Sequence, residues 1–162
     1  MTESNLYKAS AILVLILSFL MLLFQAKVCF ANDYSKWIEA CAPHKDKVID
    51  ILSKEGVSTN YYYLMVAESK CRENAVSKAG ARGFWQLMYG TSKRFGCDNP
   101  DDFKCATHAA AKYIKSLENR FDTFEDVIIA YNMGGHNYKK HGKSTQALGL
   151  VYRVKQIIKA DK

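Results

Sequence analysis

The chain has 162 residues, of which 49% are hydrophobic and 24% are charged, so its length allows one globular domain. Its formal net charge of +7 at pH 7 favours polyanionic partners. The basic residues are scattered rather than clustered with stacking aromatic side chains, which argues against a nucleic-acid-binding protein.

The first predicted element is an apolar run, Ala11 to Phe24, in which Ser18 is the one polar residue. This run is shorter than the roughly 20 apolar residues of a membrane-spanning helix. It is typical of a signal peptide, and the small residues near Ala31 suit cleavage after that position. We therefore predict a signal peptide at residues 1–31 and an exported, periplasmic domain at residues 32–162. The alternative is an uncleaved anchor, which would be the chain's one contact with the membrane.

Downstream of this segment, apolar residues recur at helical spacing nearly throughout, and no alternation typical of strands is present. Ser35 is expected to begin a short helix that Pro43 interrupts, and a second helix should run from about His44 to Lys54. Ser58 or Thr59 is expected to cap a third helix.

Residues 74–83 lack periodicity and contain glycine, so an irregular loop is predicted there. The next helix should have Pro100 in its first turn and continue to Leu117. Thr123 and Asp126 have the spacing of a capping box for the helix after it.

That helix should end at Gly134 and Gly135, and a polar loop is predicted at residues 136–143. A final helix should carry the apolar residues between Leu148 and Ile158. The predicted fold class is therefore all-α.

Cysteine usage agrees with export, because an even number of cysteines in a small exported domain favours disulfide bonds. Apart from Cys29 in the signal segment, the cysteines are Cys41, Cys71, Cys97 and Cys105. They allow three pairings. We prefer Cys97 with Cys105, which closes a short polar loop, and Cys41 with Cys71, which ties the first helix to the region after Glu68.

No metal or cofactor is expected. A zinc site formed by Cys97, Cys105 and His108 would lack a fourth ligand and the usual paired spacing. The remaining histidines are His44, His136 and His141. None has the spacing of a metal site or catalytic triad, so the histidines are interpreted as surface residues.

Glu68 is the candidate for chemistry. It lies at the end of an apolar helix, before a glycine-containing loop with Trp85. A carboxyl held against apolar walls has a raised pKa and can donate a proton near neutral pH. Taken alone, a glutamate at a helix end is more often an ordinary solvated residue, so the interpretation depends on the surrounding motifs.

Three motifs follow one another: Glu68-Ser69, GARGFWQLM at residues 80–88, and AYNMG at residues 130–134. Their order, and the eighteen residues from Glu68 to Gln86, resemble the lytic transglycosylases of the SLT-domain group, which are similar to goose-type lysozyme. The resemblance covers residues 48–158. It implies a single lysozyme-like domain with a glycan-binding cleft, and Glu68 as its catalytic acid/base.

The resemblance also implies a set of residues that line the sugar and peptide sites: Ser77, Gln86, Met88, Tyr131, Asn132 and Tyr152. Tyr152 resembles the family's C-terminal tyrosine, whose hydroxyl orients the catalytic carboxyl, although Leu148-Gly149 replace the Glu-Thr pair that commonly precedes it. Gln86 offers a donor and an acceptor to a hydroxyl-rich substrate and is expected to be the least structural of the set. Trp85 is assigned to the core.

Ordinary glycosidases use two carboxylates, and the loop after Glu68 provides no obvious second one. The resemblance implies cleavage of peptidoglycan between N-acetylmuramic acid and N-acetylglucosamine, with 1,6-anhydro ends. The alternatives are a muramidase that hydrolyses the same bond and a non-catalytic wall-binding or assembly protein. The expected partner is the glycan strand, and the small size suits an enzyme that serves a secretion or conjugation apparatus.

Overall fold

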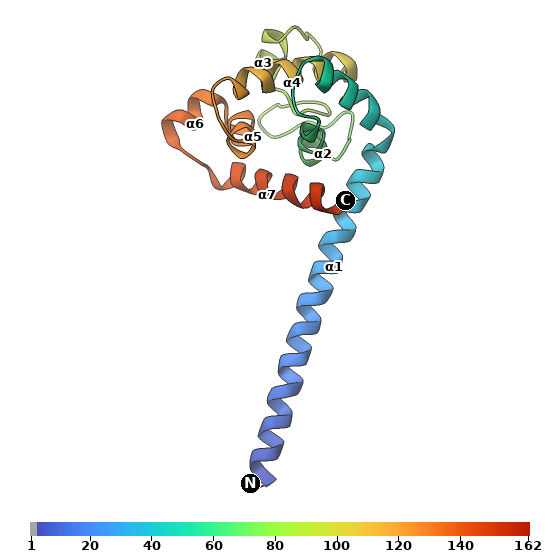
Figure 1. The fold of residues 1–162 in the computed structure, drawn as a ribbon, viewed down its shortest axis with the longest axis vertical. Helices are drawn as coiled ribbons and strands as arrows, with labels where there is room; N and C mark the ends of the chain where they lie inside the picture. Colours follow the sequence, from blue (N-terminus) through green and yellow to red (C-terminus); the bar gives the residue numbers. More distant parts are fainter. Residues whose placement is uncertain (1–2) are drawn as a thin grey trace. The chain divides into compact units, whose positions relative to one another are not determined.

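The computed structural model describes the backbone of residues 3–162 and the side chains of residues 12–25 and 34–162. The chain divides into two units, Met1–Tyr34 and Ser35–Lys162. Within the described residues there are eight helices and no named strand, which confirms the all-α prediction. The helices are α1 (Glu3–Lys54), the 3-10 helix η1 (Thr59–Tyr61), α2 (Tyr62–Ser69), α3 (Tyr89–Arg94), α4 (Phe103–Glu118), α5 (Phe124–Met133), α6 (Gly135–His141) and α7 (Thr145–Ala160) (Figure 1).

The first unit contains the N-terminal part of α1, where the apolar side chains from Ile12 to Phe24 are exposed. Among the residues that the structure describes, none of the helices combines the length and apolar character needed to cross a membrane. The predicted cleavage point after Ala31 falls within residues 26–33, whose side chains lie outside the described part of the chain.

The predicted helix break at Pro43 is wrong, because α1 continues through this residue. Proline removes one intrahelical hydrogen bond, and Pro43 is exposed, so water can satisfy the freed carbonyl. The opposing face carries Cys41, Val48 and Leu52, all fully buried. Their packing outweighs the local cost of the proline.

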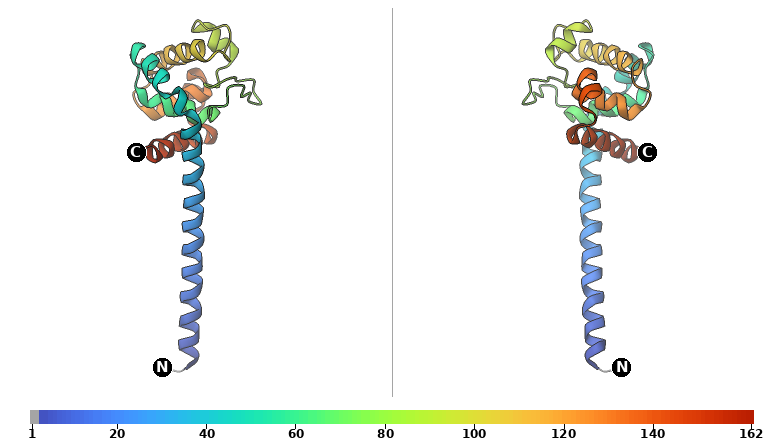
Figure 2. Two further views of the ribbon diagram at one scale, coloured as in Figure 1. Left: turned by 90° about the vertical axis from the view of Figure 1, so that its right-hand side faces the viewer. Right: turned by 90° about the vertical axis from the view of Figure 1, so that its left-hand side faces the viewer.

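Helix α2 is the central element of the second unit (Figure 1). It packs against α7, and α5 packs against both α4 and α7. Leu64, Met65 and Val66 of α2 are fully buried, as expected of a helix that other elements enclose. The loop between α2 and α3 extends away from these helices (Figure 2).

The capping prediction for Thr123 is confirmed, whereas Ser58 caps the 3-10 helix η1 that precedes α2, and α2 itself has no side-chain cap. Ser58 caps η1 through a hydrogen bond that its hydroxyl accepts from the N–H of Asn60. Thr123 caps α5 by accepting a hydrogen bond from the N–H of Asp126 at 3.1 Å. These caps satisfy N–H groups that have no partner within the helix.

Pro100 is not in a helical turn, contrary to the prediction. Helix α4 begins three residues later, because the carboxylate of Asp102 accepts a hydrogen bond from the N–H of Cys105 at 2.7 Å and caps the helix there. An aspartate at this position is a stronger initiation signal than the preceding proline.

The predicted loop at residues 136–143 is also wrong over most of its length, because it contains α6. Gly134 ends α5 with a φ of 81°, and the chain re-enters a helix at Gly135. Gly135 is buried, and a side chain there would meet the guanidinium of Arg120 at 3.0 Å. The short helix α3 was not predicted either, since Tyr89 is the one large apolar side chain among its six residues, which show no apolar periodicity.

Two disulfide bonds join the cysteines of the preferred pairing. Cys41 of α1 is bonded to Cys71, two residues beyond the end of α2. Cys97, which follows α3, is bonded to Cys105 in the first turn of α4. The first bond attaches the end of α2 to α1, and the second attaches α3 to α4.

Candidate active site

Glu68 lies in the last turn of α2, one residue before the helix ends. The helix terminates because Lys70 and Cys71 have left-handed backbone conformations, with φ of 54° and 55°. The buried hydroxyl of Ser69 accepts a hydrogen bond from the N–H of Cys71 at 3.1 Å, which supports the turn. Together with the Cys41–Cys71 disulfide, this turn holds the end of α2, and with it Glu68, in place.

The side chain of Glu68 borders a cavity of about 180 Å³. Its lining comes from α2, the loop that follows it, α3, α5 and α7. The lining residues are Glu68, Ser77, Ala79, Ala81, Gln86, Leu87, Met88, Thr91, Tyr131, Asn132 and Gln146. The structure therefore brings Glu68 together with five of the six residues that were predicted to surround it.

Glu68 is poised to exchange a proton near neutral pH. Burial raises its pKa from the ordinary value of 4.5 to about 7, while the charge of Arg153 and a hydrogen bond with Asn132 act in the opposite direction. At a pKa near 7 both the acid and the carboxylate are populated at neutral pH, which suits a group that must alternate between acid and base.

The loop beside Glu68 is held by glycine and by backbone pairing. Gly83 has a φ of 69°, and a β-carbon there would lie 2.3 Å from the carbonyl oxygen of Pro100, so no other residue fits. Arg82 and Leu87 exchange two backbone hydrogen bonds, and the Arg82 guanidinium binds the carboxylate of Asp101 at 2.6 Å. These contacts place Gln86 and Met88 at the cavity.

Gln86 differs from its prediction, because its amide group is a structural element of this loop. Its side-chain nitrogen donates hydrogen bonds to the carbonyl oxygens of Ala75 and Gly83, both at 2.9 Å. Both of its N–H donors are therefore in use, and only its carbonyl oxygen is left to accept from a substrate hydroxyl. The prediction that Gln86 is the least structural residue of the set is wrong.

Ser77 and Met88 form the outer part of the lining. The Ser77 hydroxyl accepts a hydrogen bond from the N–H of Ala81 at 3.0 Å within a tight turn, and its own O–H remains available to donate. Met88 is 47% exposed, so it offers a flexible apolar surface to a ligand.

Tyr131 and Asn132 reach the cavity from the C-terminal half of α5. The Tyr131 hydroxyl donates to the carbonyl oxygen of Trp85 at 2.8 Å, so its buried ring acts as a wall. Burial, followed by the nearby charge of Glu68, raises the pKa of Tyr131 well above its ordinary value. Trp85 is fully buried, as predicted, and donates its indole N–H to Thr107 at 3.0 Å.

The prediction for Tyr152 is wrong, because this residue is 62% exposed and does not line the cavity. Leu150 and Val154 of α7 face the core, and Tyr152 lies about 200° around the helix from Leu150. The residues of α7 near the site are instead Gln146, which lines the cavity, and Arg153, whose charge lowers the pKa of Glu68. A spacing of seven positions, or about two helical turns, places both on one helix face, and this spacing was present in the sequence.

Glu68 is the one carboxylate among the described residues that line the cavity. Glu73 is exposed and lies outside the lining. Asp101 is bound to Arg82, and Asp102 caps α4. A mechanism that needs a second enzyme carboxylate at this bond therefore has no candidate in this lining.

The histidines and cysteines do not form a metal site in the described part of the chain. The sulfurs of Cys97 and Cys105 are joined in a disulfide, so they are not available as thiolate ligands. His108 contacts the carboxylate of Glu55 at 2.8 Å. His44 is half-buried, with its ring centroid 4.8 Å from that of Phe84, so its interpretation as a surface residue is wrong.

Comparison with known families adds an independent observation. A family model described as the transglycosylase SLT domain matches residues 49–150. The match covers more than half of the chain and includes Glu68, the loop that carries Gln86, and the Tyr131-Asn132 pair. The helical fold, the enclosed glutamate and this match lead to one assignment: the chain belongs to the SLT transglycosylase domain family.

Proposed function

We propose that this protein is a peptidoglycan lytic transglycosylase in which Glu68 acts first as general acid and then as general base. The observation that carries the proposal is a single carboxyl group, bordering the cavity, whose pKa of about 7 permits both duties. Membership of the SLT family makes the glycan strand of peptidoglycan the expected substrate.

In the first step the protonated Glu68 carboxyl donates its proton to the glycosidic oxygen between N-acetylmuramic acid and N-acetylglucosamine. The bond from that oxygen to C1 of the muramic acid breaks, and both bonding electrons leave with the oxygen. The acetamido oxygen of the same sugar attacks C1 and takes up the positive charge. The substrate thus supplies the group that a second enzyme carboxylate provides in ordinary retaining glycosidases.

In the second step the C6 hydroxyl of the muramic acid attacks C1 and displaces the acetamido oxygen. The Glu68 carboxylate accepts the proton of that hydroxyl and returns to its starting state. The product is a 1,6-anhydro ring, and no water is consumed.

Two neighbours suit the ionised form that exists between these steps. Arg153 places a positive charge near the carboxylate, and Asn132 hydrogen-bonds to it. Both interactions lower the pKa of Glu68, so they stabilise the carboxylate that burial alone would disfavour. This balance leaves the carboxyl able to give and to accept a proton.

The proposal is tested by mass analysis of the muropeptides released from purified sacculi by the wild type and by Glu68→Gln. Anhydro ends from the wild type and no release by the variant are expected. Reducing ends from the wild type would show that the protein is a hydrolase of the same bond and not a transglycosylase. Equal release by both proteins would show that the reaction does not require the Glu68 carboxyl. No release by either protein would favour a non-catalytic wall-binding protein.

We also propose that residues 1–31 direct export and that residues 32–162 act in the periplasm. The boundary between the two units, at Tyr34 and Ser35, lies close to this division, and disulfide bonds suit an oxidising compartment. A reporter fused to the first 31 residues should be exported, and its retention in the cytoplasm would contradict the proposal. Service to a secretion or conjugation apparatus stays a prediction, which co-purification from cross-linked cells can test.

A further inference from the structure

The end of α2, which carries Glu68, has a backbone conformation that glycine usually provides. Lys70 and Cys71 follow the helix with φ of 54° and 55°, in the left-handed region. A β-carbon disfavours this region, so helices that end in it commonly do so at glycine. Four other helices, α1, α3, α5 and α6, are each followed within two residues by a glycine of positive φ, namely Gly56, Gly96, Gly134 and Gly142. The end of α2 must therefore be held by other contacts.

Contacts within the turn and with α1 hold these two residues. The N–H of Cys71 donates to the hydroxyl of Ser69 at 3.1 Å, and the ammonium group of Lys70 lies 4.2 Å from the ring centroid of Trp37. The covalent contact is the disulfide from Cys71 to Cys41, a fully buried residue of α1. Water can replace the two non-covalent contacts, whereas it cannot replace the disulfide. The disulfide is thus the contact that keeps Cys71 in its left-handed conformation.

The position of Glu68 depends on this turn. Glu68 precedes Cys71 by three residues, which is less than one helical turn. Its carboxyl borders the cavity, with a hydrogen bond to Asn132 of α5 and the charge of Arg153 of α7 nearby. If Cys71 leaves the left-handed region, the last turn of α2 loosens and the carboxyl becomes accessible to water.

We propose that the Cys41–Cys71 disulfide positions Glu68 for catalysis, so that the protein becomes active only after this pair of thiols is oxidised. The inference rests on the proposed function, in which Glu68 is both acid and base. Cys41 and Cys71 are positioning residues, because neither lines the cavity. The chain is then inactive in the reducing cytoplasm and becomes active in an oxidising compartment.

The oxidation is a thiol–disulfide exchange with a protein that carries a reactive disulfide. The thiolate of Cys71, a half-buried residue, attacks one sulfur of that disulfide, and the other sulfur leaves as a thiolate. The thiolate of Cys41 then attacks the sulfur of Cys71 and displaces the oxidant from the mixed disulfide. Cys41 and Cys71 lose two protons and two electrons, and the oxidant gains both and leaves as a dithiol.

The test compares two variants of the full chain that lack the bond, Cys41→Ala/Cys71→Ala and Cys41→Ala/Cys71→Gly, on purified sacculi at pH 7. Alanine disfavours the left-handed conformation, whereas glycine adopts it without strain. The alanine pair should lower kcat about tenfold and leave KM within about twofold, because the residues that bind the sugars stay in place. The glycine pair should recover most of the lost kcat.

Each other outcome of this comparison counts against the inference. Equal losses for the alanine and glycine pairs, or no loss for either, would overturn it, because the bond would then have no role in holding the backbone of Cys71. Loss of the helical circular dichroism of Cys41→Ala/Cys71→Ala would overturn it as well, because the bond would then hold the whole domain and not the end of α2.

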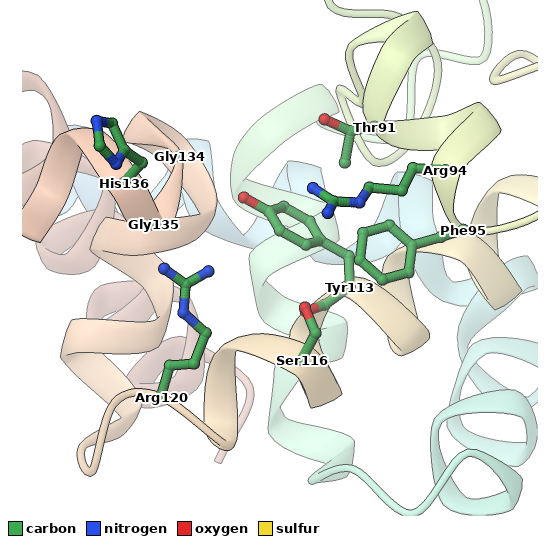
Figure 3. A pocket seen from close by; sticks show the side chains of 9 residues that line it. All are labelled: Thr91, Arg94, Phe95, Tyr113, Ser116, Arg120, Gly134, Gly135 and His136. Carbon is green, nitrogen blue, oxygen red and sulfur yellow. The ribbon is translucent and has the colours of Figure 1, made fainter.

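Cys97→Ala/Cys105→Ala is the matched control, because it removes the disulfide that joins α3 to α4. These two helices line another cavity, of about 500 Å³, and Glu68 is not among its lining residues (Figure 3). The control should be less stable but keep kcat within about twofold. A loss of kcat as large as that of Cys41→Ala/Cys71→Ala would overturn the inference.

The control also isolates the redox step, because it retains the Cys41–Cys71 bond. Dithiothreitol should lower its kcat about tenfold, as in the alanine pair, and oxidised glutathione should restore it. Thiol labelling of Cys41 and Cys71 reports when the bond has been reduced. Full activity of the reduced protein would overturn the inference.

A measurement without substrate separates failure of this inference from failure of the proposed function. Carbon NMR of labelled glutamate side chains follows the ionisation of Glu68, whose signal is the one missing in Glu68→Gln. The pKa of Glu68 should be about 7 in the oxidised wild type, and exposure to water should lower it toward 4.5 in the alanine pair. If the wild type cleaves no sacculi but this difference is found, the positioning role stands without the enzymatic one. Equal pKa values would overturn the positioning role.

Discussion

Glu68→Gln should stabilise the folded protein in a strongly pH-dependent way, because burial of a carboxylate opposes folding. The pKa of Glu68 rises from 4.5 to about 7 in the folded state, so the folded state binds the proton more tightly than the unfolded chain. Stability therefore falls as the pH rises from about 4.5 to 7, where the folded carboxyl ionises. A pKa shift of this size lowers the free energy of unfolding by at most about 3 kcal/mol above pH 7.

Glutamine has nearly the same shape and carries no charge, so the variant avoids this cost. We expect the free energy of unfolding of Glu68→Gln to exceed that of the wild type by about 3 kcal/mol at about pH 9 and to equal it at about pH 4. Urea unfolding followed by the fluorescence of the buried Trp85 measures both values. Glu73→Gln, which changes an exposed carboxylate, is the control and should have little effect at either pH. A gain in the free energy of unfolding that is the same at both pH values would show that ionisation of the buried Glu68 carboxyl is not its cause.

Three further predictions follow from the same site. Arg153→Gln removes a charge that lowers the pKa of Glu68, so the alkaline limb of the kcat/KM profile should move upward by about one pH unit; a limb that stays in place would contradict this. Gly83→Ala places a β-carbon 2.3 Å from the Pro100 carbonyl oxygen and should cost about 3 kcal/mol or more in urea unfolding, whereas Gly80→Ala, with open space around it, should cost less. Tyr152→Phe should leave kcat/KM within about twofold, because the hydroxyl lies outside the cavity, and a large loss would restore the tyrosine to the mechanism.

The position of Glu68 was predictable because the three motifs occur in a recognisable order and spacing. A glutamate at the end of an apolar helix is weak evidence by itself, and the GARGFWQLM and AYNMG motifs that follow it identified Glu68 as the residue at the site. Tyr131 and Asn132 were found through their motif, and their spacing of one residue on α5 allows the first to pack inward while the second faces Glu68.

The roles of Gln86 and Tyr152 were not predictable by matching residue types. Gln86 carries the expected side chain, but its positive φ of 48° and two backbone acceptors direct its amide group into the loop. Tyr152 was assigned because its residue type matches the family's C-terminal tyrosine. The angular position of each residue around the axis of α7 decides instead which side chains face Glu68. Applying the 3.6-residue period from Leu150 would have excluded Tyr152 and indicated Gln146 and Arg153.

The unbroken helix at Pro43 and the short helix α6 reflect tertiary packing that overrides local signals. At Pro43 the opposite face of α1 is buried and cross-linked by Cys41. At Gly135 the absence of a side chain lets the helix approach Arg120. Each outcome depends on a neighbour that is distant in the sequence, so neither follows from a local window.

Cleavage of peptidoglycan in water enriched in heavy oxygen shows whether the C6 hydroxyl or water attacks C1 of the N-acetylmuramic acid. If the C6 hydroxyl attacks, the wild type should produce anhydro ends that carry no heavy oxygen, and Glu68→Gln should produce no new ends. Heavy oxygen at C1 of the new N-acetylmuramic acid ends would contradict this mechanism.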